Sequence, residues 1–315
     1  MIRLSFIVPF YGVEKYIEEC IRSLYDQDIP MEEYEVICVD DCSPDGSRAF
    51  VEKLQKEYPT LRLLIHAENK RQGGARNTGL REAKGRYIWF VDSDDYIKQN
   101  CLKGLLELAE REDLDILDFD FDADYTKQFF RKNVESFEMG PCSGADYVFS
   151  QHQGRWSWRC VCVWGGLIKR ELISEMQFRE KVQYEDNDYA LEMYARAKRV
   201  HHIPDQPYYY RVVEQSTVHR DVAIKDITYN IELLHAYTKL YDDMKAIDAR
   251  WGKGVEELIR FVSVQIVRQL TKVPATERRQ FYQRRMGNLE AIRPYLGKKV
   301  WLSLNMNIAR RIFRI

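Results

Sequence analysis

The stretch YIWFVDSDDYI, residues 87–97, places four consecutive apolar residues directly in front of three aspartates. Residues 88–91 are Ile, Trp, Phe and Val, and such a short unbroken apolar run is typical of a strand that is buried on both faces. Asp92, Asp94 and Asp95 follow within four positions. Like charges this close together in a partly dry site repel and raise each other's pKa. The stretch therefore predicts a buried strand that ends in a site where a ligand offsets this repulsion.

Apolar runs of this kind alternate with amphipathic segments over the first part of the chain. The runs have the length of strands, and the segments between them carry apolar residues at helical spacing. Strands that alternate with helices of about a dozen residues form crossover units and a mainly parallel sheet. The sequence therefore predicts an α/β fold with a Rossmann-like sheet flanked by helices. The predicted strands are 4–10, 34–41, 61–66 and 87–92, and the predicted helices are 14–27, 46–58, 73–83 and 102–112.

The pattern changes in the second part of the chain. Residues 114–124 alternate apolar and acidic side chains, which predicts a strand with one wet face. We interpret its acidic stripe, Asp118 to Asp124, as a solvated edge that discourages pairing with further strands. From about Asp221 the chain is predicted to be helical. We expect one domain over residues 1–220 and a helical C-terminal region over 221–315.

Composition restricts the class of protein. The 315 residues carry a net charge of −1, whereas general nucleic-acid binders are usually basic, so we expect no nucleic-acid partner. The seven cysteines are scattered and odd in number, which predicts reduced thiols in a cytosolic chain. The N-terminal residues lack the long apolar stretch of a signal peptide, and no apolar run is long enough for a transmembrane helix. We therefore expect a cytoplasmic protein.

Polar side chains follow the ends of the predicted strands. In an open parallel sheet, ligands bind at the carboxyl ends of the strands. Asp40 and Asp41 end the second strand and open the stretch DDCSPDGS, and Asp92 opens the stretch after the fourth strand. The first stretch also fits a plain turn, since Asp, Ser and Gly favour turns. The second stretch also fits a helix cap, although a cap needs one carboxylate and three are present.

A divalent cation explains the aspartate cluster more fully than a cap does. Mg²⁺ and Mn²⁺ prefer oxygen ligands, bind through one or two carboxylates, and complete their shells with water and substrate phosphates. The sequence therefore predicts Mn²⁺ or Mg²⁺ at this aspartate cluster, completed by a diphosphate. Arg76 and Asn77 follow a glycine pair at the start of a predicted helix. The free N–H groups of a helix start and the fork of an arginine both suit a phosphate.

These motifs stand in the order and spacing of a known family. SFIVPFYG, VICVDDCSPDGS, NKRQGGARNTGL and GRYIWFVDSDDYI follow one another over about the first 110 residues, and YEDNDYALEMY (184–194) stands downstream. The sequence closely resembles family 2 glycosyltransferases of the GT-A fold. The resemblance implies a nucleotide-sugar-binding half in residues 1–110 and an acceptor half in 111–220. It also implies inverting transfer of a sugar, usually from a UDP-sugar, to a hydroxyl of a glycan or lipid-linked acceptor in bacterial surface polysaccharide biosynthesis.

The resemblance assigns donor-side roles to the positions that match the family's motifs. Pro9 and Tyr11 would line the pocket for the base and ribose, and Asp41 would accept a hydrogen bond from the base. Asp92-Ser93-Asp94 would be the DxD-type motif, with Asp94 as the metal ligand. Asp92 would serve the ribose or the metal, and Asp95 would be a second contact. Gly12 departs from the pattern, because many relatives carry Asn there. The expected donor-binding residues are Pro9, Tyr11, Asp40, Asp41, Arg76, Asn77, Asp92 and Asp95.

The same resemblance assigns the acceptor side. Asp186 would be the general base, with Glu185 as its neighbour. Inverting transfer is a single displacement, and a carboxylate must take the proton of the acceptor hydroxyl as the bond forms. The alternative is an exposed helix start that Asp186 or Asn187 caps. Trp164 would belong to a sugar-stacking wall near the acceptor, or to the core, where aromatic side chains are as often found.

The C-terminal segment is basic and partly apolar. From residue 278 to residue 315 there are ten Lys or Arg residues against one acidic residue, Glu290. The last stretch, VWLSLNMNIARRIFRI, mixes bulky apolar residues with arginines, as an interfacial helix does. One alternative is peripheral contact with the inner face of the plasma membrane. The other is packing on the catalytic domain or on the second subunit of a homodimer.

Two other enzyme classes fit the sequence poorly. A dinucleotide-dependent dehydrogenase needs GxGxxG at the first strand–helix turn, and this chain has PFYGVEKY there. A phosphatase with an aspartyl nucleophile would not explain VDDCSPDGS. A non-catalytic nucleotide-sugar-binding module is the alternative that we retain.

Overall fold

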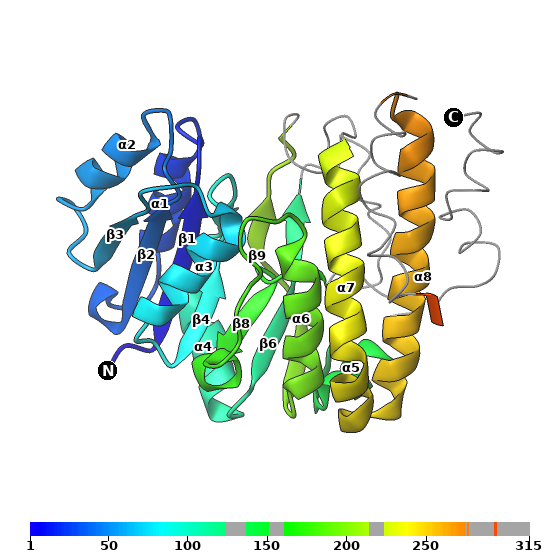
Figure 1. Ribbon diagram of the computed structural model, residues 1–315. Helices are drawn as coiled ribbons and strands as arrows, with labels where there is room; N and C mark the ends of the chain where they lie inside the picture. The colour runs from blue at the N-terminus through cyan, green and yellow to red at the C-terminus, as the bar shows by residue number, and fades with distance from the viewer. Residues whose placement is uncertain (124–136, 151–160, 214–223, 275, 277–292, 295–315) are drawn as a thin grey trace. The chain divides into compact units, whose positions relative to one another are not determined.

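The computed structural model falls into two compact units, and we describe each by itself (Figure 1). The first unit comprises Met1–Lys181 and Tyr189–Ser216, and the second comprises Val182–Asp188 and Thr217–Ile315. The boundary between Ser216 and Thr217 lies close to the domain boundary expected at residue 220. The second unit also includes the short segment Val182–Asp188, which was not expected. The division into donor and acceptor halves stays a prediction. The structure describes residues 1–123, 137–150, 161–213, 224–274, 276 and 293–294.

Four parallel strands form one side of the sheet in the first unit. They are β1 (Leu4–Phe10), β2 (Tyr34–Asp40), β3 (Leu61–Ile65) and β4 (Tyr87–Phe90), in the order β3-β2-β1-β4. Every residue of β1, β2 and β4 is buried, as their unbroken apolar runs predict. The predicted α/β crossover pattern is confirmed for this half.

Three helices connect these strands, and a fourth follows β4 and the short strand β5 (Tyr96–Ile97). They are α1 (Ile17–Tyr25), α2 (Ser47–Leu54), α3 (Arg71–Glu82) and α4 (Leu102–Arg111) (Figure 1). The α3 helix lies unusually close to the sheet, because a Cβ atom at Gly79 would stand only 2.5 Å from Ile7 Cγ2 of β1. Glycine at this position lets the helix that follows the NKRQGGARN stretch rest directly on the first strand.

Beyond β4 the sheet is mixed. Strand β8 (Gly166–Lys169) runs antiparallel to β4 and to β6 (Ile116–Ala123), and β6 pairs in parallel with β9 (Val200–Tyr210). The short strands β5 (Tyr96–Ile97) and β7 (Met139–Cys142) pair antiparallel with β9. The first unit also contains α5 (Gly144–Val148) and the 3₁₀ turns η1 (Met31–Glu33) and η5 (Arg170–Ile173). The fold class is confirmed, and its parallel part is the half that begins the chain.

The acidic stripe of β6 is not a solvated edge, and this prediction is wrong. Strand β6 lies between β8 and β9 inside the sheet. Asp118 is only 2% exposed, and its carboxylate accepts hydrogen bonds of 2.6 Å from the hydroxyls of Tyr147 and Tyr194. The ring of His202 in β9 places Nδ1 2.6 Å from the same carboxylate. Asp118 therefore belongs to a buried polar cluster, whereas Asp120 and Asp122 of the same strand are partly exposed. Asp124 lies outside the described residues.

The second unit is helical, as predicted. It contains α7 (Ile224–Ile247) and α8 (Ala249–Lys272), and Asp248 between them caps α8 by accepting a hydrogen bond from the Arg250 N–H. The two helices pack on each other, and Asn230 donates to Gln269 Oε1 across them at 2.9 Å. In the described part of the chain, no helix is long and apolar enough to cross a bilayer. Most of the basic C-terminal segment lies outside the described residues, so both of its alternatives stay predictions.

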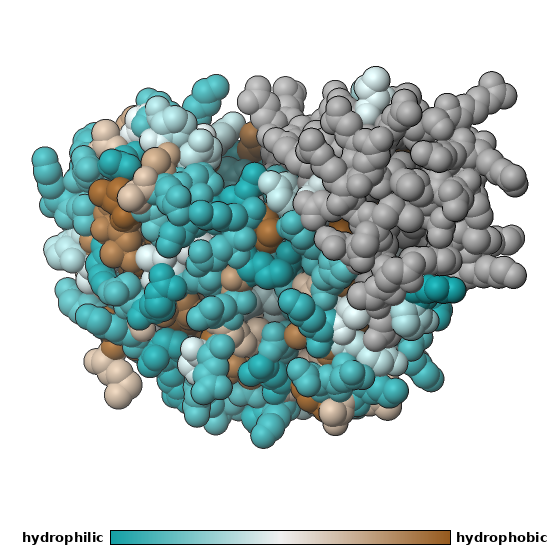
Figure 2. Space-filling model, in the orientation of Figure 1, coloured by the Kyte–Doolittle hydropathy of each residue, from teal (hydrophilic) through white to brown (hydrophobic). Residues whose placement is uncertain are grey.

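The surface of the first unit is mainly hydrophilic on the face drawn in Figure 2. Apolar side chains gather there over the edge strand β3, whose last residue, Ile65, is exposed. Exposure increases along β3 toward its carboxyl end, where the polar loops of the sheet begin.

Candidate functional site

Three loops with polar side chains leave the same edge of the parallel sheet. Strand β1 lies between β2 and β4, and Phe10 at its end stands opposite Asp40 in β2. The Asp41 N–H donates to the Phe10 carbonyl at 2.9 Å, which joins the first two loops at their origin. Because the chain leaves β1 toward β2 and later returns to its other side at β4, this edge is a topological switch point, where open sheets bind ligands.

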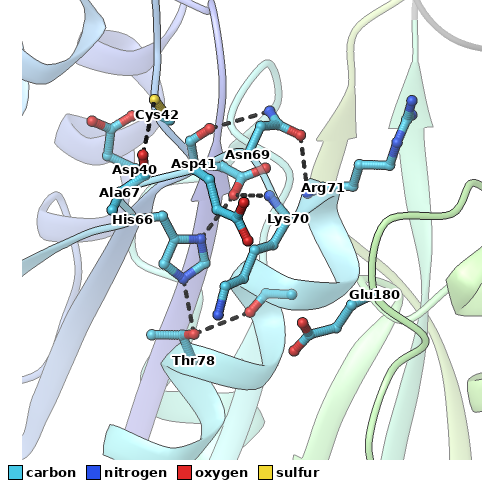
Figure 3. Close-up of polar contacts among 12 residues, drawn as sticks. Asp40, Asp41, Cys42, His66, Ala67, Asn69, Lys70, Arg71, Thr78 and Glu180 are labelled. Atoms are coloured by element: carbon cyan, nitrogen blue, oxygen red, sulfur yellow. Dashed lines mark hydrogen bonds and ion pairs between the residues drawn. The ribbon is translucent and has the colours of Figure 1, made fainter.

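Among the described residues, no group donates a hydrogen bond to one of the two carboxylate oxygens of Asp41 (Figure 3). The residue is 2% exposed, and Oδ1 lies 2.8 Å from both the Lys70 N–H nitrogen and His66 Nδ1. Its other oxygen, Oδ2, is buried and has no hydrogen-bond partner. A buried carboxylate oxygen without a donor costs free energy unless a ligand supplies one. Asp41 is therefore held in place through one oxygen, and a ligand that donates to the other would offset this cost.

His66 is a residue of this site that the sequence analysis missed. It follows β3 directly and is buried, and its ring bridges the loop after β2 and helix α3, with Nδ1 toward Asp41 and Nε2 2.9 Å from Thr78 Oγ1 (Figure 3). His66 stands at the end of the predicted strand LRLLIH, where the strands β2 and β4 carry their aspartates. This position could have identified His66 as a candidate site residue. His66 orients the Asp41 carboxylate.

Asp40 is used within the protein. It is fully buried, its Oδ1 accepts from the Ser43 N–H at 2.8 Å, and its Oδ2 accepts from Arg48 Nε at 2.6 Å. These bonds shape the turn after β2, as the turn interpretation of DDCSPDGS predicts. A direct contact between Asp40 and a donor stays a prediction.

The loop after β4 contains a carboxylate in a partly dry environment. Burial and the neighbouring Asp92 carboxylate raise the pKa of Asp94 to about 6. Within the described part of the chain, no side chain donates a hydrogen bond to the Asp94 carboxylate. Asp92 differs, because its Oδ1 accepts from the buried Arg76 guanidinium at 2.8 Å. Among these residues, Asp94 thus lacks the cationic hydrogen-bond donor that Asp92 has in Arg76.

Asp95 faces inward from the same loop. Its Oδ2 accepts from the Tyr208 hydroxyl at 2.5 Å, and its Oδ1 accepts from the Arg211 N–H at 2.7 Å. Burial and the charges of Asp94 and Asp92 raise its pKa well above the ordinary value. Both oxygens therefore have protein partners, in contrast to Asp94.

The aspartates suit a cation that arrives with a ligand. No group of three or more His, Cys, Asp or Glu side chains among the described residues is arranged to hold a metal ion. Mg²⁺ and Mn²⁺, however, bind through one or two carboxylates together with phosphate oxygens and water. Asp94, with Asp92 beside it, fits that mode, since burial and repulsion leave its charge poorly compensated.

Tyr11 and Asn77 have different environments. The Tyr11 side chain is 51% exposed at the exit of β1, directly after the buried Pro9, so its ring is available to a ligand. Asn77 is buried, donates to the Phe178 carbonyl at 2.9 Å and accepts from the Phe178 N–H at 2.8 Å. Its carboxamide therefore holds a loop segment against α3, and contact with the donor stays a prediction.

Trp164 lies in the core of the first unit. It is 7% exposed, its ring stacks on Tyr208 with 4.6 Å between centroids, and its carbonyl accepts from Trp89 Nε1 at 2.9 Å. The core alternative for Trp164 fits this packing, and a contact with an acceptor stays a prediction.

The acidic motif YEDNDYALEMY forms a helix start. Helix α6 (Glu185–Arg196) spans the two units, begins with Glu185 and carries Asp186 in its first turn. Glu185 is buried, and Asn187 Nδ2 donates to Asp186 Oδ1 at 2.9 Å. The roles of Asp186 and Glu185 stay predictions.

Three of the six described non-glycine residues with positive φ lie beside these site residues. Cys42 after Asp41, Arg71 at the start of α3, and Tyr184 before α6 have φ between 60° and 66°. Non-glycine residues rarely adopt this left-handed region, and such strain clusters at functional sites. Gly12 has φ of 67°, in the left-handed region that glycine adopts without strain. Glycine in place of Asn is therefore compatible with the backbone at this position.

The comparison with protein families identifies the chain. A family model described as glycosyl transferase family 2 matches residues 5–176. The chain belongs to glycosyl transferase family 2. This membership confirms the resemblance carried by the strand-end motifs.

Individual relatives agree with this assignment. The chain is 34% identical over 221 residues to the uncharacterized glycosyltransferase EpsJ of Bacillus subtilis (strain 168), covering 66% of this chain and 60% of EpsJ. It is 39% identical over 117 residues to the poly(ribitol-phosphate) beta-N-acetylglucosaminyltransferase TarS of Staphylococcus aureus (strain Mu50), covering 37% of this chain and 20% of TarS. The chain thus spans less than two thirds of the length of either relative.

A solved structure shows the same fold. The crystal structure of S. aureus TarS 1–349 in complex with UDP-GlcNAc matches with a TM-score of 0.72 at 21% identity, covering 99% of this chain and 86% of that one. The predicted GT-A-type fold is confirmed.

Proposed function

We propose that this chain is an inverting glycosyltransferase that moves a sugar from a UDP-sugar to a hydroxyl of a glycan or lipid-linked acceptor. Family membership supports transfer from a nucleotide-linked donor. The solved complexes of a protein of the same fold with UDP-GlcNAc and with UDP support uracil as the base. TarS is named for a poly(ribitol-phosphate) acceptor, which supports a polymer of the bacterial surface as the class of acceptor.

One observation carries this proposal: a buried, unpartnered acceptor and a poorly compensated carboxylate follow two strands that flank β1. Asp41 Oδ2 follows β2 and lacks a donor, which suits the N–H of a uracil base. Asp94 follows β4, and burial destabilises the ionised form of its carboxyl group. The exposed ring of Tyr11 follows β1 between them. A uracil base needs a hydrogen-bond acceptor, a ribose packs on an exposed ring, and a diphosphate needs a carboxylate that can hold a cation. Asp41, Tyr11 and Asp94 would supply these contacts in the strand order β2-β1-β4.

Asp94, with Asp92, would hold a divalent cation together with the diphosphate of the donor. When bound, that cation would supply Lewis-acid stabilisation of the charge that develops on the leaving nucleoside diphosphate. Arg76 orients Asp92 through its 2.8 Å hydrogen bond and adds positive charge beside it. The residues of this chain thus fix the carboxylates before the donor arrives, and a fixed group costs no reorganisation during the reaction.

Asp186 would be the general base, with Glu185 beside it. An acceptor hydroxyl is a weak nucleophile, and a carboxylate that takes its proton as the bond forms contributes roughly 10²–10⁴-fold. The Asn187 side chain donates to one oxygen of Asp186, which orients the carboxylate. The left-handed conformation of Tyr184, two residues earlier, supports a functional constraint on this helix start.

The test is release of nucleoside diphosphate from a panel of UDP-, GDP- and dTDP-sugars, with Mn²⁺ and with chelator. We expect slow, metal-dependent turnover of one UDP-sugar by the native protein and loss of turnover in Asp94→Ala and Asp186→Asn. Asp113→Asn, an exposed aspartate on the turn after α4, serves as the matched control and should retain turnover. Binding of UDP without turnover of any donor would overturn the proposal in favour of a nucleotide-sugar-binding module.

A further inference from the structure

We infer that Asp95 is a positioning residue: its carboxylate anchors the end of β9, from Tyr208 to Arg211, to the loop that carries Asp92 and Asp94. This inference rests on the proposed function and deepens it. It gives the third aspartate of DSDD a role that differs from that of the other two. Asp94 would face the ligand, whereas Asp95 faces the protein.

The contacts of Asp95 leave little of its carboxylate for a cation or a donor. Each oxygen accepts a short hydrogen bond, from the Tyr208 hydroxyl at 2.5 Å and from the Arg211 N–H at 2.7 Å. The side chains of Asp95 and Tyr208 are both buried. Coordination of a cation by Asp95 would break bonds in a place where the released donors have no water to replace them.

Tyr208 connects Asp95 to the backbone of the loop. While its hydroxyl donates to Asp95, the same oxygen accepts from the Asp92 N–H at 3.2 Å. The Asp95 N–H in turn donates to the Asp92 carbonyl at 3.0 Å, which closes the turn. The position of the Asp92 peptide therefore depends on the Tyr208 hydroxyl, and the Asp94 carboxylate lies within this turn.

Arg211 fixes the other end of the anchored segment. Its guanidinium donates to Glu19 at 2.8 Å and lies 5.0 Å from the ring of Tyr16 in the approach to α1 and 5.4 Å from the ring of Tyr96 in β5. Cation–π contacts and an ion pair thus hold the side chain, while the backbone N–H holds Asp95. The end of β9 and the aspartate loop are attached at several points and must move together.

A comparison of four variants tests this inference. Asp95→Asn and Tyr208→Phe remove the charge or the hydroxyl of the anchor, and Asp94→Asn removes the expected metal ligand. Tyr87→Phe is the matched control, because it deletes another buried tyrosine hydroxyl, which donates to the Ala109 carbonyl at 2.8 Å elsewhere in the unit. The measurements are Mn²⁺ affinity in the presence of UDP, kcat and KM for the UDP-sugar that is turned over, and amide hydrogen exchange of a peptide spanning residues 208–213.

The inference predicts a different result for each aspartate. Tyr208→Phe and Asp95→Asn should keep the Mn²⁺ affinity within about threefold, yet lower kcat by about 100-fold with little change in KM, as expected for a small misplacement of reacting groups. Tyr208→Phe should also speed exchange in residues 208–213. Asp94→Asn should weaken Mn²⁺ binding at least about tenfold without changing that exchange, and Tyr87→Phe should change neither.

Two results would overturn the inference. If Asp95→Asn weakens Mn²⁺ binding as strongly as Asp94→Asn, then Asp95 is a metal ligand. If Tyr208→Phe leaves both exchange and kcat unchanged, then the anchor positions nothing. Failure of the proposed function is distinguishable, since the native protein would then turn over no donor, and the exchange measurement would still decide whether Asp95 and Tyr208 hold the end of β9.

Discussion

Lowering the pH should weaken the binding of Mn²⁺ through Asp94. Burial and Asp92 raise the pKa of this carboxyl to about 6. A cation binds the ionised form, so protons and Mn²⁺ compete for the same oxygens. With a pKa of about 6, roughly nine tenths of Asp94 is ionised at pH 7 and roughly one tenth at pH 5. Protonation of Asp94 alone should therefore raise the Kd for Mn²⁺ about tenfold between pH 7 and pH 5.

An ordinary aspartate would behave differently. With the unperturbed pKa of about 3.9, more than nine tenths of the carboxyl is ionised at pH 5, and the affinity would change little. The assay is titration of Mn²⁺ by electron paramagnetic resonance at pH 5, 6 and 7 in the presence of UDP-N-acetylglucosamine. This donor is chosen because both of its phosphates are esterified, so neither has a second proton to lose in that range.

Asp94→Asn separates the contribution of Asp94 from that of other groups. The variant should bind Mn²⁺ weakly at every pH and lose most of the pH dependence of the native protein. A Kd that is the same at pH 5 and pH 7 in the native protein would refute the reasoning. It would mean either that Asp94 is ionised at pH 5 in the folded protein or that the cation binds without it.

Three further perturbations test other parts of the first unit and the acidic motif. His66→Ala should weaken UDP binding by about three- to tenfold, measured by calorimetry, because Asp41 loses the partner that orients it; unchanged affinity would contradict the role of His66. Asp186→Asn should lower kcat by roughly 10²–10⁴-fold while the Kd for UDP stays constant, with Asp188→Asn in the same turn as the control; comparable losses in both variants would point to damage of the helix. Asp118→Ala should lower the free energy of unfolding by about 3 kcal/mol or more in denaturant titrations, because two buried tyrosine hydroxyls lose their acceptor; a loss below about 1 kcal/mol would show that the cluster relaxes at little cost.

The first half of the fold was predictable because its strands are buried on both faces. A strand such as β4 has no polar position to obscure its apolar run, and the helices between such strands follow from apolar spacing. Because the apolar runs show where the strands end, they also showed that Asp41 and Asp94 follow strand ends. His66 was overlooked, although it follows β3 in the same way, because a single histidine carries less signal than a pair of aspartates.

The second half was harder to predict because its pairings join segments that are far apart in the chain. Strand β6 pairs with β8 and β9, and only its tertiary neighbours explain why Asp118 is buried. Tyr147, Tyr194 and His202 come from three different elements, and no local pattern connects them to Asp118. The partners of Asp95 were missed for the same reason, since Tyr208 lies more than a hundred residues away.

The paired bonds between Asn77 and Phe178 divide one long loop into two short ones. The connection from η5 to α6 comprises residues 174–184, and the carboxamide of Asn77 binds both the N–H and the carbonyl of Phe178, as a neighbouring strand would. On either side of that point, 174–177 and 179–184 have the length of ordinary connections, roughly 2–8 residues. The segment near Phe178 is therefore ordered before any ligand binds, and a ligand that touches it has less conformational entropy to remove. Aspartate at position 77 could not donate and glutamine would be too long, so the Asn77 carboxamide, together with the Lys181 N–H bond to the Lys70 carbonyl, limits how far this loop can adapt to a substrate.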